Sequence, residues 1–283
     1  MEISYLNGKY IPGDEINISA DDRGFLFADG IYEAIRWYGN FFYDMDSHMT
    51  RLKRSMGEIR LSWPEAGTFP EIAARLVKIN SLEDRPAIVY VQVTRGVARR
   101  SHAFPSPPVN PTVYAYARSF RPDNNLINNG IRTILRKDIR WTRCDIKTIA
   151  LLPNVLSLQE AKENDCHECI FSRDDIITEC CHSNVFFVLD GVLRTHPESE
   201  LILSGVTRKN VLRIAREAGI PYIEEAVRED QLSRVSEAFV TNTSFEIVPI
   251  ISINGLKVGE GIPGPVSRLL RGKFDAEIKV LKG

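Results

Sequence analysis

The sequence lacks the features that direct a protein to nucleic acid or into a membrane. Its 283 residues carry 36 Lys and Arg against 37 Asp and Glu, so the net charge of −1 produces no overall field toward nucleic acid or an anionic membrane. No apolar run approaches the length of a bilayer span. The opening residues, MEISYLNGKYIPGDE, hold no basic segment followed by an apolar one, so we expect no signal peptide and a cytoplasmic location.

Cysteine is also scarce. The 5 cysteines are Cys144, Cys166, Cys169, Cys180 and Cys181. An odd number without an export signal favours reduced thiols over a disulfide framework. The spacing CHEC, followed by CCH, raises the alternative of a zinc site, since thiolates and imidazole suit zinc. Neighbouring Cys180 and Cys181 would point to opposite sides of an extended chain, and free cysteine packs as a small apolar residue, so we predict no metal site.

Short alternating segments dominate the first part of the chain. ISYLNGKYI predicts a hairpin turning at Asn7-Gly8, and GIYEAIRWYGNFFYD predicts another turning near Gly39-Asn40. Helices are expected after an N-cap at Asp46 and over residues 70–82. AIVYVQVT and TVYAYARSF read as strands, joined by the long basic and proline-rich loop VARRSHAFPSPPVNP.

The polar stretch RPDNNLINNG, residues 121–130, is the best linker candidate. It divides the chain into an N-terminal domain, residues 1–120, and a C-terminal domain, residues 131–283. In the second part we expect helices over residues 152–164, 206–218 and 265–274, with hairpin turns at Asp190-Gly191 and Asn254-Gly255. Strands and helices interleave, yet many connections are hairpins, which predicts mixed sheets.

One lysine stands at an unusual place in RWTRCDIKTIALLPNVL. Lys147 is followed by a run without charge, from Thr148 to Leu158. A lysine against apolar surroundings gives up its proton more readily and becomes a usable amine nucleophile. The simpler interpretation is that Lys147 ends a strand and points into water.

Four further patterns are each weak when taken alone. LSGVTRKN opens a helix whose free N–H groups suit a phosphate, and TNTSFE supplies neutral donors, although an ordinary capped helix and a polar turn explain them equally. Glu179 ends an apolar strand, where a buried carboxylate usually has a partner. Arg100 and His102 suit a carboxylate, although most charged loops are simply solvated.

Together these segments resemble the class IV (fold type IV) pyridoxal-phosphate aminotransferases. The likeness runs from DRGFLFADGIYEAIR to the C-terminal helix, and its central signature is ECCHSNVF, LRT and LSGVTR at the family's spacing. It implies a mixed α/β (α+β) two-domain enzyme with pyridoxal 5′-phosphate as cofactor. The small N-terminal domain would be α/β, and the larger C-terminal domain would be a mixed sheet or pseudo-barrel with helices.

The resemblance also implies roles for individual residues. Lys147 would be catalytic through a Schiff base with the cofactor, Glu179 would face the pyridine nitrogen, and Leu203 would pack on the ring. Arg51, Val206, Thr207 and Thr243, with Asn242 beside it, match phosphate contacts, and Arg140 matches a basic residue near the cofactor.

Within the family the chain is most similar to the D-amino-acid aminotransferases. That likeness rests on VTRGVARRSHAFP, where Arg100 and His102, with Tyr32, would hold the substrate carboxylate. It implies transfer between a D-amino acid such as D-alanine and a 2-oxo acid such as 2-oxoglutarate, in a homodimer whose loop reaches the neighbouring subunit's site. The alternatives are an L-branched-chain aminotransferase, an aminodeoxychorismate lyase and, outside enzymes, a zinc-stabilised binding protein.

The sequence departs from the family pattern at several positions. Ala28 stands where a glycine is usual, and Asn242 stands where a serine is expected. Cys180, Cys181 and His182 replace a run of small residues beside Glu179. These departures bear on substrate range and on the cofactor's electronic properties more than on the type of reaction.

Overall fold

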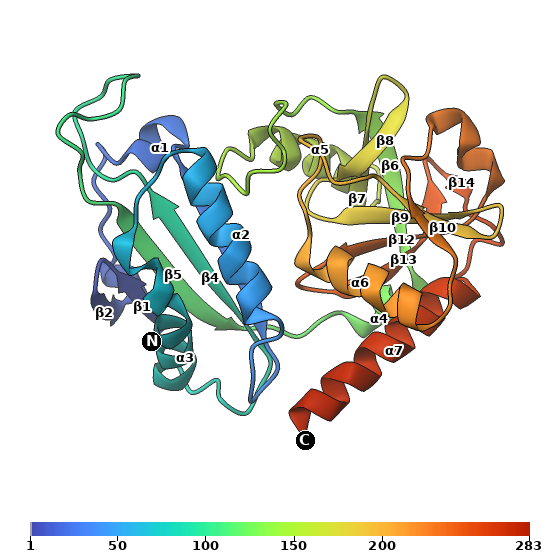
Figure 1. Cartoon of the computed structure of the whole chain (residues 1–283), viewed down its shortest axis with the longest axis horizontal. Helices are drawn as coiled ribbons and strands as arrows, with labels where there is room; N and C mark the ends of the chain where they lie inside the picture. Colours follow the sequence, from blue (N-terminus) through green and yellow to red (C-terminus); the bar gives the residue numbers. More distant parts are fainter. Residues whose placement is uncertain (1) are drawn as a thin grey trace. The chain divides into compact units, whose positions relative to one another are not determined.

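The computed structural model describes residues 2–283, which form two compact units (Figure 1). The first unit runs to Arg121 and also takes in Ile146–Ala150 and Lys282, while the second holds Pro122–Asp145, Leu151–Leu281 and Gly283. The segment that carries Lys147 therefore belongs to the first unit, although the sequence alone assigns it to a second domain.

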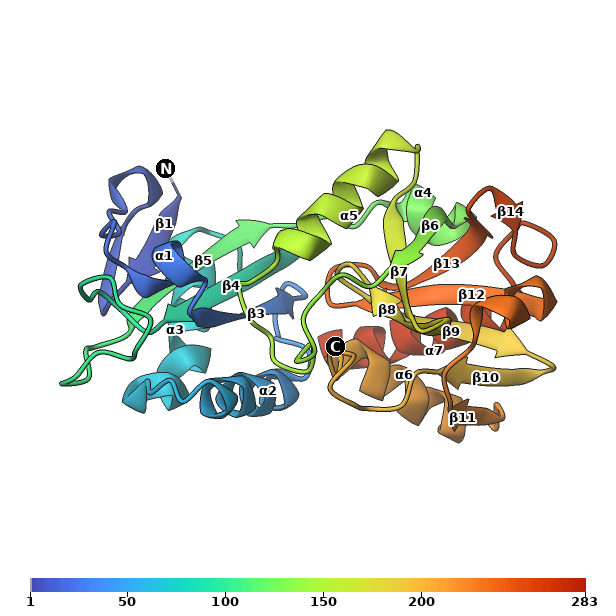
Figure 2. The same cartoon turned by 90° about the horizontal axis from the view of Figure 1, so that it is seen from above.

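The first unit is an antiparallel sheet covered on one face by helices. Its strands are β1 (Ile3–Leu6), β2 (Lys9–Pro12), β3 (Gly30–Trp37), β4 (Ala87–Thr94) and β5 (Thr112–Ser119), and its helices are η1 (Gly13–Glu15), α1 (Arg23–Phe27), α2 (Met45–Glu58), η2 (Pro64–Thr68) and α3 (Phe69–Ile79). The strand order is β2-β1-β5-β4-β3, which leaves β3 at an edge. In Figure 2, α2 and α3 lie on the same side of the sheet, where Leu52 and Leu76 pack with Val89 and Val91 in the core.

The two hairpins that the sequence predicts in the first unit differ in how well they match the structure. The hairpin at Asn7-Gly8 is confirmed, since Leu6 pairs with Lys9 and both turn residues have positive φ, as a two-residue hairpin turn requires. The second predicted hairpin, near Gly39-Asn40, is present but short. The Tyr38 N–H donates to the Phe41 carbonyl, Trp37 bridges to Phe42, and α2 then begins at Met45, so no second strand of full length follows the turn.

Helix α2 also begins earlier than expected. It starts at Met45, preceded by Asp44 in the left-handed conformation, so the predicted N-cap at Asp46 lies inside the helix. Leu52 and Met56 face the core, as the apolar spacing predicts.

The second unit is a larger mixed sheet with helices. Its strands are β6 (Ile131–Lys137), β7 (Glu168–Arg173), β8 (Ile176–Cys180), β9 (Asn184–Leu189), β10 (Val192–Thr195), β11 (Tyr222–Glu224), β12 (Val235–Asn242), β13 (Glu246–Ile253) and β14 (Leu256–Lys257), and its helices are α4 (Asn124–Asn129), α5 (Leu152–Glu163), α6 (Val206–Glu217), η3 (Glu229–Arg234) and α7 (Pro265–Lys282). The strand order is β11-β10-β9-β12-β13-β6-β7-β8, with β14 beside β13.

This sheet curls around one apolar core. Ile177 of β8, Phe187 of β9 and Val248 of β13 belong to the same buried cluster, although their strands lie at different places along the sheet. The β6–β7 and β6–β13 pairs are parallel, and most others are antiparallel, so the mixed α/β architecture is confirmed. Both hairpin turns predicted here, at Asp190-Gly191 and Asn254-Gly255, have positive φ and connect paired strands.

Two elements of the second unit differ from the sequence expectation. The stretch 121–130, predicted to be a linker, contains α4, which Asp123 caps by accepting a hydrogen bond from the Asn125 N–H. Helix α7 continues eight residues past the expected end at Phe274, since no breaker occurs before Gly283. Among residues 2–283, no helix is both long and apolar enough to cross a membrane.

Candidate active site

Lys147 is held at the free edge of the first unit's sheet. The Tyr32 N–H donates to the Lys147 carbonyl at 3.0 Å, the Ile149 N–H donates to the Gly30 carbonyl at 3.2 Å, and Thr148 bridges to Ile31. The segment thus covers an edge strand that would otherwise present unpaired backbone groups. On the other side, the Lys147 N–H donates to Ser55 Oγ of α2 at 3.3 Å. The backbone of Lys147 is therefore fixed from two directions.

The Lys147 side chain lies over an aromatic ring. Its Nζ is 4.1 Å from the centroid of the Tyr32 ring, a cation–π distance, and Tyr32 in turn stacks on Tyr90 with 5.6 Å between ring centroids. Helix α5 begins only at Leu152, so Lys147 precedes the apolar helix instead of opening it. The structure thus brings together two predicted site residues, Lys147 and Tyr32.

Arg51 is locked against a carboxylate that sequence reasoning missed. Its Nε donates to Glu33 Oε1 at 2.6 Å and its Nη2 donates to Glu33 Oε2 at 2.9 Å, while His48 Nδ1 lies 2.9 Å from the same Oε2. Burial raises the pKa of Glu33, but Arg51 and His48 outweigh burial and hold it well below its usual range. Burial also lowers the pKa of His48. Glu33 shares the apolar face of β3 with Ile31 and Ile35. A carboxylate at such a position in the sequence could have indicated a buried ion pair.

Arg100 and His102 lie together beside Phe27. The Arg100 guanidinium is 5.1 Å from the Phe27 ring centroid, and the His102 ring centroid is 5.4 Å from that of Phe27. Both side chains are exposed on the loop between β4 and β5. Two predicted members of the carboxylate clamp thus pack against the same ring, and Tyr32, the third predicted member, packs on Tyr90 instead.

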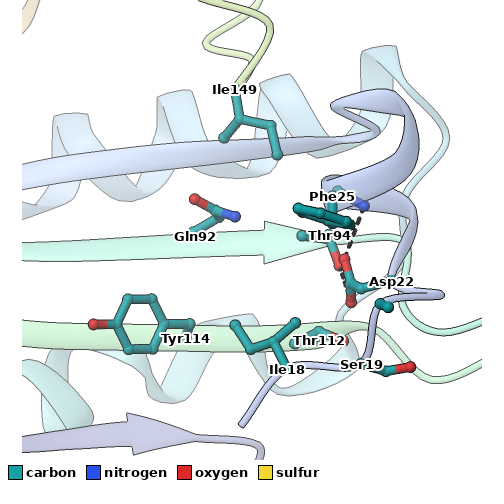
Figure 3. A pocket seen from close by; sticks show the side chains of 11 residues that line it. Ile18, Ser19, Asp22, Phe25, Gln92, Thr94, Thr112, Tyr114 and Ile149 are labelled. Atoms are coloured by element: carbon teal, nitrogen blue, oxygen red, sulfur yellow. Dashed lines mark hydrogen bonds between the residues drawn. The ribbon is translucent and has the colours of Figure 1, made fainter. Parts of the chain in front are cut away.

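A cavity of about 580 Å³ opens on the uncovered face of the first sheet, shown in Figure 3. Among its lining residues are Gln92 and Tyr114, direct cross-strand neighbours in line with Tyr32. At its other end Asp22 accepts hydrogen bonds from Thr94 Oγ1 at 3.0 Å and from the Gly24 N–H at 2.8 Å. Within residues 2–283, its lining holds none of the predicted site residues.

In the second unit, Glu179 is the centre of a buried polar group. Arg140 Nη1 donates to Glu179 Oε1, and Oε2 accepts from Asn184 Nδ2 at 2.9 Å and from the Leu203 N–H at 3.0 Å. Arg140 also binds Asp138, at 2.9 Å from Nε and from Nη2. Burial raises the pKa of Glu179 to about 7, against the opposing effect of Arg140. The structure therefore joins three predicted residues, Glu179, Arg140 and Leu203.

Asn184 links this group to the start of α6. Its Nδ2 donates to the Leu203 carbonyl at 2.8 Å as well as to Glu179, and a Cβ added at Gly205 would lie 2.0 Å from Asn184 Oδ1. Gly205 precedes Val206 and Thr207, and no side chain caps this helix start. Sequence reasoning missed Asn184; the signal was an asparagine opening the apolar strand NVFFVL.

Asn242 ends β12 and organises the turn that carries Thr243. Its Oδ1 accepts from the Phe245 N–H at 2.8 Å, and its Nδ2 donates to Ser183 Oγ at 3.0 Å. Next to it, the Thr241 hydroxyl is buried and has no hydrogen-bond partner, and Thr241 lies opposite Asn184 in the strand register.

The unusual turn after Glu179 is anchored by a second missed carboxylate, Glu168. Its oxygens accept from the Cys181 N–H and from Ser183 Oγ, both at 3.0 Å, and lie 2.8 Å from His182 Nδ1. Burial raises the pKa of Glu168, but His182, the Cys169 N–H and Ser183 outweigh burial and bring the pKa below its usual value. Cys180 and Cys181 pack into different apolar clusters, and no cluster of potential ligands within residues 2–283 could hold a metal ion.

Comparison with known proteins places this arrangement in a family. The family model for class IV amino-transferases matches residues 30–253. D-alanine aminotransferase of Staphylococcus aureus (strain MSSA476) is 38% identical over 280 residues, 99% of each chain. D-alanine aminotransferase of Bacillus licheniformis is 39% identical over 264 residues, 93% of this chain and 92% of that protein.

Solved structures show the same fold. Branched-chain amino acid aminotransferase of Escherichia coli superposes with a TM-score of 0.90 at 23% identity, covering 97% of this chain and 94% of that one. The branched-chain aminotransferase of the archaeon Thermoproteus uzoniensis, solved with norvaline, gives a TM-score of 0.85 at 24% identity, covering 96% and 93%. Because the family model spans most of the chain and the curated relatives match it from end to end, the chain belongs to the class IV aminotransferases, which are pyridoxal-phosphate-dependent transaminases.

Proposed function

We propose that this enzyme transfers the amino group of a D-amino acid such as D-alanine to a 2-oxo acid such as 2-oxoglutarate. The observation that carries the proposal is the likeness to D-alanine aminotransferases along 99% of the chain. The pairing of Arg100 with His102 on Phe27 supports it further, since a guanidinium beside an imidazole suits the carboxylate of an amino acid.

The second unit offers groups that fit the phosphate of pyridoxal 5′-phosphate. The start of α6 has no side-chain cap, so its N–H groups suit an anion, and the buried Thr241 hydroxyl lacks a partner. We assign the phosphate to Arg51, Val206, Thr207, Asn242 and Thr243, and the face of the ring to Leu203. Glu33 holds the Arg51 guanidinium in one orientation for this role.

When bound, the cofactor supplies an electron sink for the negative charge that develops on the substrate when its α-proton leaves. We assign Glu179 to the ring nitrogen. Its pKa of about 7 places its proton within reach of exchange at neutral pH, and Arg140, Asn184 and the Leu203 N–H fix its two oxygens.

Lys147 is the proposed catalytic residue. In this role its Nζ would hold the cofactor until the amino group of the substrate takes its place, and the freed amine would then accept the α-proton and return it to the carbon on the other side of the substrate nitrogen. Its backbone bonds to β3 and α2 keep Nζ at one place while the substrate exchanges. Arg100 and His102 hold the α-carboxylate and so decide which face of the amino acid meets Lys147.

We further propose a homodimer in which this pair serves the neighbouring subunit. Arg100 and His102 are exposed, and α5 presents a row of exposed apolar side chains, Leu152, Val155 and Leu156, that a partner would cover. Sedimentation of the purified enzyme tests the dimer, and a monomer at working concentration would contradict it. We also propose a cytoplasmic location, because all 5 cysteines are free thiols.

The absorption spectrum of the purified holoenzyme tests the substrate. D-alanine and L-leucine are added in separate cuvettes, and we expect only D-alanine to bleach the blue-violet cofactor band. Bleaching by L-leucine alone would identify a branched-chain aminotransferase. A band that neither bleaches, with pyruvate released without an amino acceptor, would identify the lyase.

A further inference from the structure

The loop that carries Arg100 and His102 is long, exposed and devoid of helix or strand, spanning residues 95–111 between β4 and β5. Loops of this kind are usually mobile, whereas a substrate clamp needs fixed geometry. Figure 1 shows α1 beside this loop. At the base of the loop, the Arg23 N–H donates to the Gly96 carbonyl at 3.0 Å, and Asp22 bridges to Val97. The beginning of the loop is therefore tied to the start of α1.

The centre of the loop is held by one buried side chain. Arg23 is 3% exposed, and its Nη1 donates to the Ser101 carbonyl at 2.6 Å and to the Ala103 carbonyl at 3.3 Å. These two carbonyls flank His102 on either side. The same guanidinium donates from Nε to Asp29 Oδ2 at 2.8 Å. Arg23 thus joins the backbone around His102 to a carboxylate near the start of β3.

Asp29 extends this support through a second arginine. Arg95 donates to Asp29 from Nε at 2.8 Å and from Nη2 at 2.9 Å, and it binds the Ile59 and Arg60 carbonyls beyond the end of α2 at 2.7 and 2.8 Å. The Arg95 guanidinium also lies 3.7 Å from the centroid of the Phe104 ring. Burial raises the pKa of Asp29, but hydrogen bonds from the two arginines outweigh it and lower the pKa, so the carboxylate is charged at neutral pH.

We propose that Arg23 and Asp29 are positioning residues for substrate recognition, which fix the Arg100–His102 pair in the orientation that binds the α-carboxylate. Arg23 does so directly, through the Ser101 and Ala103 carbonyls, and Asp29 does so through Arg23 and through Arg95, which lies over Phe104. This inference rests on the proposed function, in which that pair holds the substrate. It predicts that damage to the support weakens substrate capture while leaving the bound cofactor and the proton transfer at Lys147 intact.

The test uses the holoenzyme and the substitution Arg23→Lys. Lysine keeps the charge beside Asp29 but lacks the planar fork that reaches Asp29 and both carbonyls together. We expect KM for D-alanine to rise roughly ten- to hundred-fold, with kcat within about three-fold of the parent enzyme. The absorption of the bound cofactor and its stoichiometry should be unchanged. Arg85→Lys, in an exposed Arg–Asp pair of the same unit, is the matched control and should leave KM unchanged.

A second variant, Phe104→Ala, tests the proposal independently in case Arg23→Lys does not fold. Phe104 is 43% exposed, so Phe104→Ala removes the ring under Arg95 at little risk to the core. We expect it to raise KM for D-alanine roughly three- to ten-fold.

The variant Arg100→Ala separates the two proposals. If it leaves KM for D-alanine unchanged, the clamp and its support are both wrong. If Arg100→Ala raises KM while Arg23→Lys and Phe104→Ala do not, only the support is wrong. Adding Arg23→Lys to Arg100→Ala should raise KM by a smaller factor than Arg23→Lys does in the parent enzyme, because part of the clamp that Arg23 positions is already lost. If Arg23→Lys raises KM by the same factor with and without Arg100→Ala, Arg23 has only a structural role. A lower kcat with unchanged KM in Arg23→Lys would lead to the same conclusion.

Discussion

The two units each contain a buried arginine–glutamate pair, and the pKa values of the two glutamates are shifted in opposite directions. In the first unit Arg51 meets Glu33 with two hydrogen bonds and His48 adds a third contact, so the pKa of Glu33 lies well below its usual range. In the second unit Arg140 is shared between Glu179 and Asp138, and burial raises the pKa of Glu179 to about 7.

Pairing with arginine therefore does not by itself decide the charge of a buried carboxylate. Glu33 receives two hydrogen bonds from Arg51 and one contact from His48, and it serves as a permanent counter-ion. Glu179 competes with Asp138 for Arg140, and the negative charge of Asp138 further favours its protonated form. The Arg51–Glu33 pair therefore fixes the arginine in one orientation, whereas Glu179 of the second pair can gain or lose a proton near neutral pH.

The largest expected effect comes from removing the permanent counter-ion. Glu33→Gln leaves the Arg51 charge buried without its carboxylate, which we expect to lower the free energy of unfolding by about 3–5 kcal/mol. Urea denaturation measures this loss. Glu2→Gln, in the exposed pair with Arg118, is the control and should change the free energy of unfolding by less than about 1 kcal/mol. A similar, small loss in both variants would erase the distinction between the two glutamates.

The two glutamates should also differ in how their contributions to stability depend on pH. Because the pKa of Glu179 is raised, the folded state keeps a proton that the unfolded state releases, so its contribution to stability falls as pH rises from about 4.5 to 7. Glu179→Gln should remove this fall, which amounts to about 3 kcal/mol at most in the cofactor-free protein.

Denaturation of the parent enzyme and the variant at pH 5 and pH 7.5 measures that difference. Glu33 contributes stability that is present above its unfolded pKa and is lost only as the pH falls below it. The titration of Glu33 itself therefore adds no slope between these two pH values. A slope that survives in Glu179→Gln would show that another group causes it.

A smaller change should make the second pair more like the first. Asp138→Asn frees Arg140 from its competing carboxylate and removes one negative charge near Glu179. We expect the pH-dependent loss of stability to move to lower pH and to shrink by about 1 kcal/mol. The same denaturation series detects it, and an unchanged midpoint would mean that Asp138 does not contribute to the raised pKa of Glu179.

The smallest expected change in the free energy of unfolding comes from Ala28, which contacts neither arginine–glutamate pair. Ala28 ends α1 in the left-handed conformation, with φ of 53°, which explains why glycine is usual there. Ala28→Gly should raise the free energy of unfolding by about 0.5–1 kcal/mol. Ala34→Gly, inside β3, should lower it by a similar amount, and a loss in both would contradict the strained backbone at Ala28.

The sequence predicts those parts of the structure that depend on neighbouring residues. The turns at Asn7-Gly8 and Asp190-Gly191, the strands β4 and β5, and the start of α6 all follow from local chemistry and apolar period. The mixed two-unit fold followed from the same patterns and from the family resemblance.

What sequence reasoning missed depends on which side chains folding brings together. Glu33 lies inside β3, and Glu168 and Asn184 open the apolar strands β7 and β9. Each finds its partner on a neighbouring strand, helix or turn that folding brings beside it. Local pattern gives the position of such a residue but not its partner. For the same reason the sequence alone does not place Lys147 on the edge of β3, in the unit from which it is distant along the chain.

That placement has a consequence for the order in which the protein is made. The Lys147 N–H binds Ser55 across 92 residues of sequence, so its segment reaches the first unit's sheet only after all the strands of that sheet, which end with β5 at Ser119, have been made. Until then β3 remains an open edge on a nascent sheet, able to pair with other chains. The residue proposed for catalysis thus also completes that edge, and substitutions around residues 146–150 should affect the yield of folded protein as well as its activity.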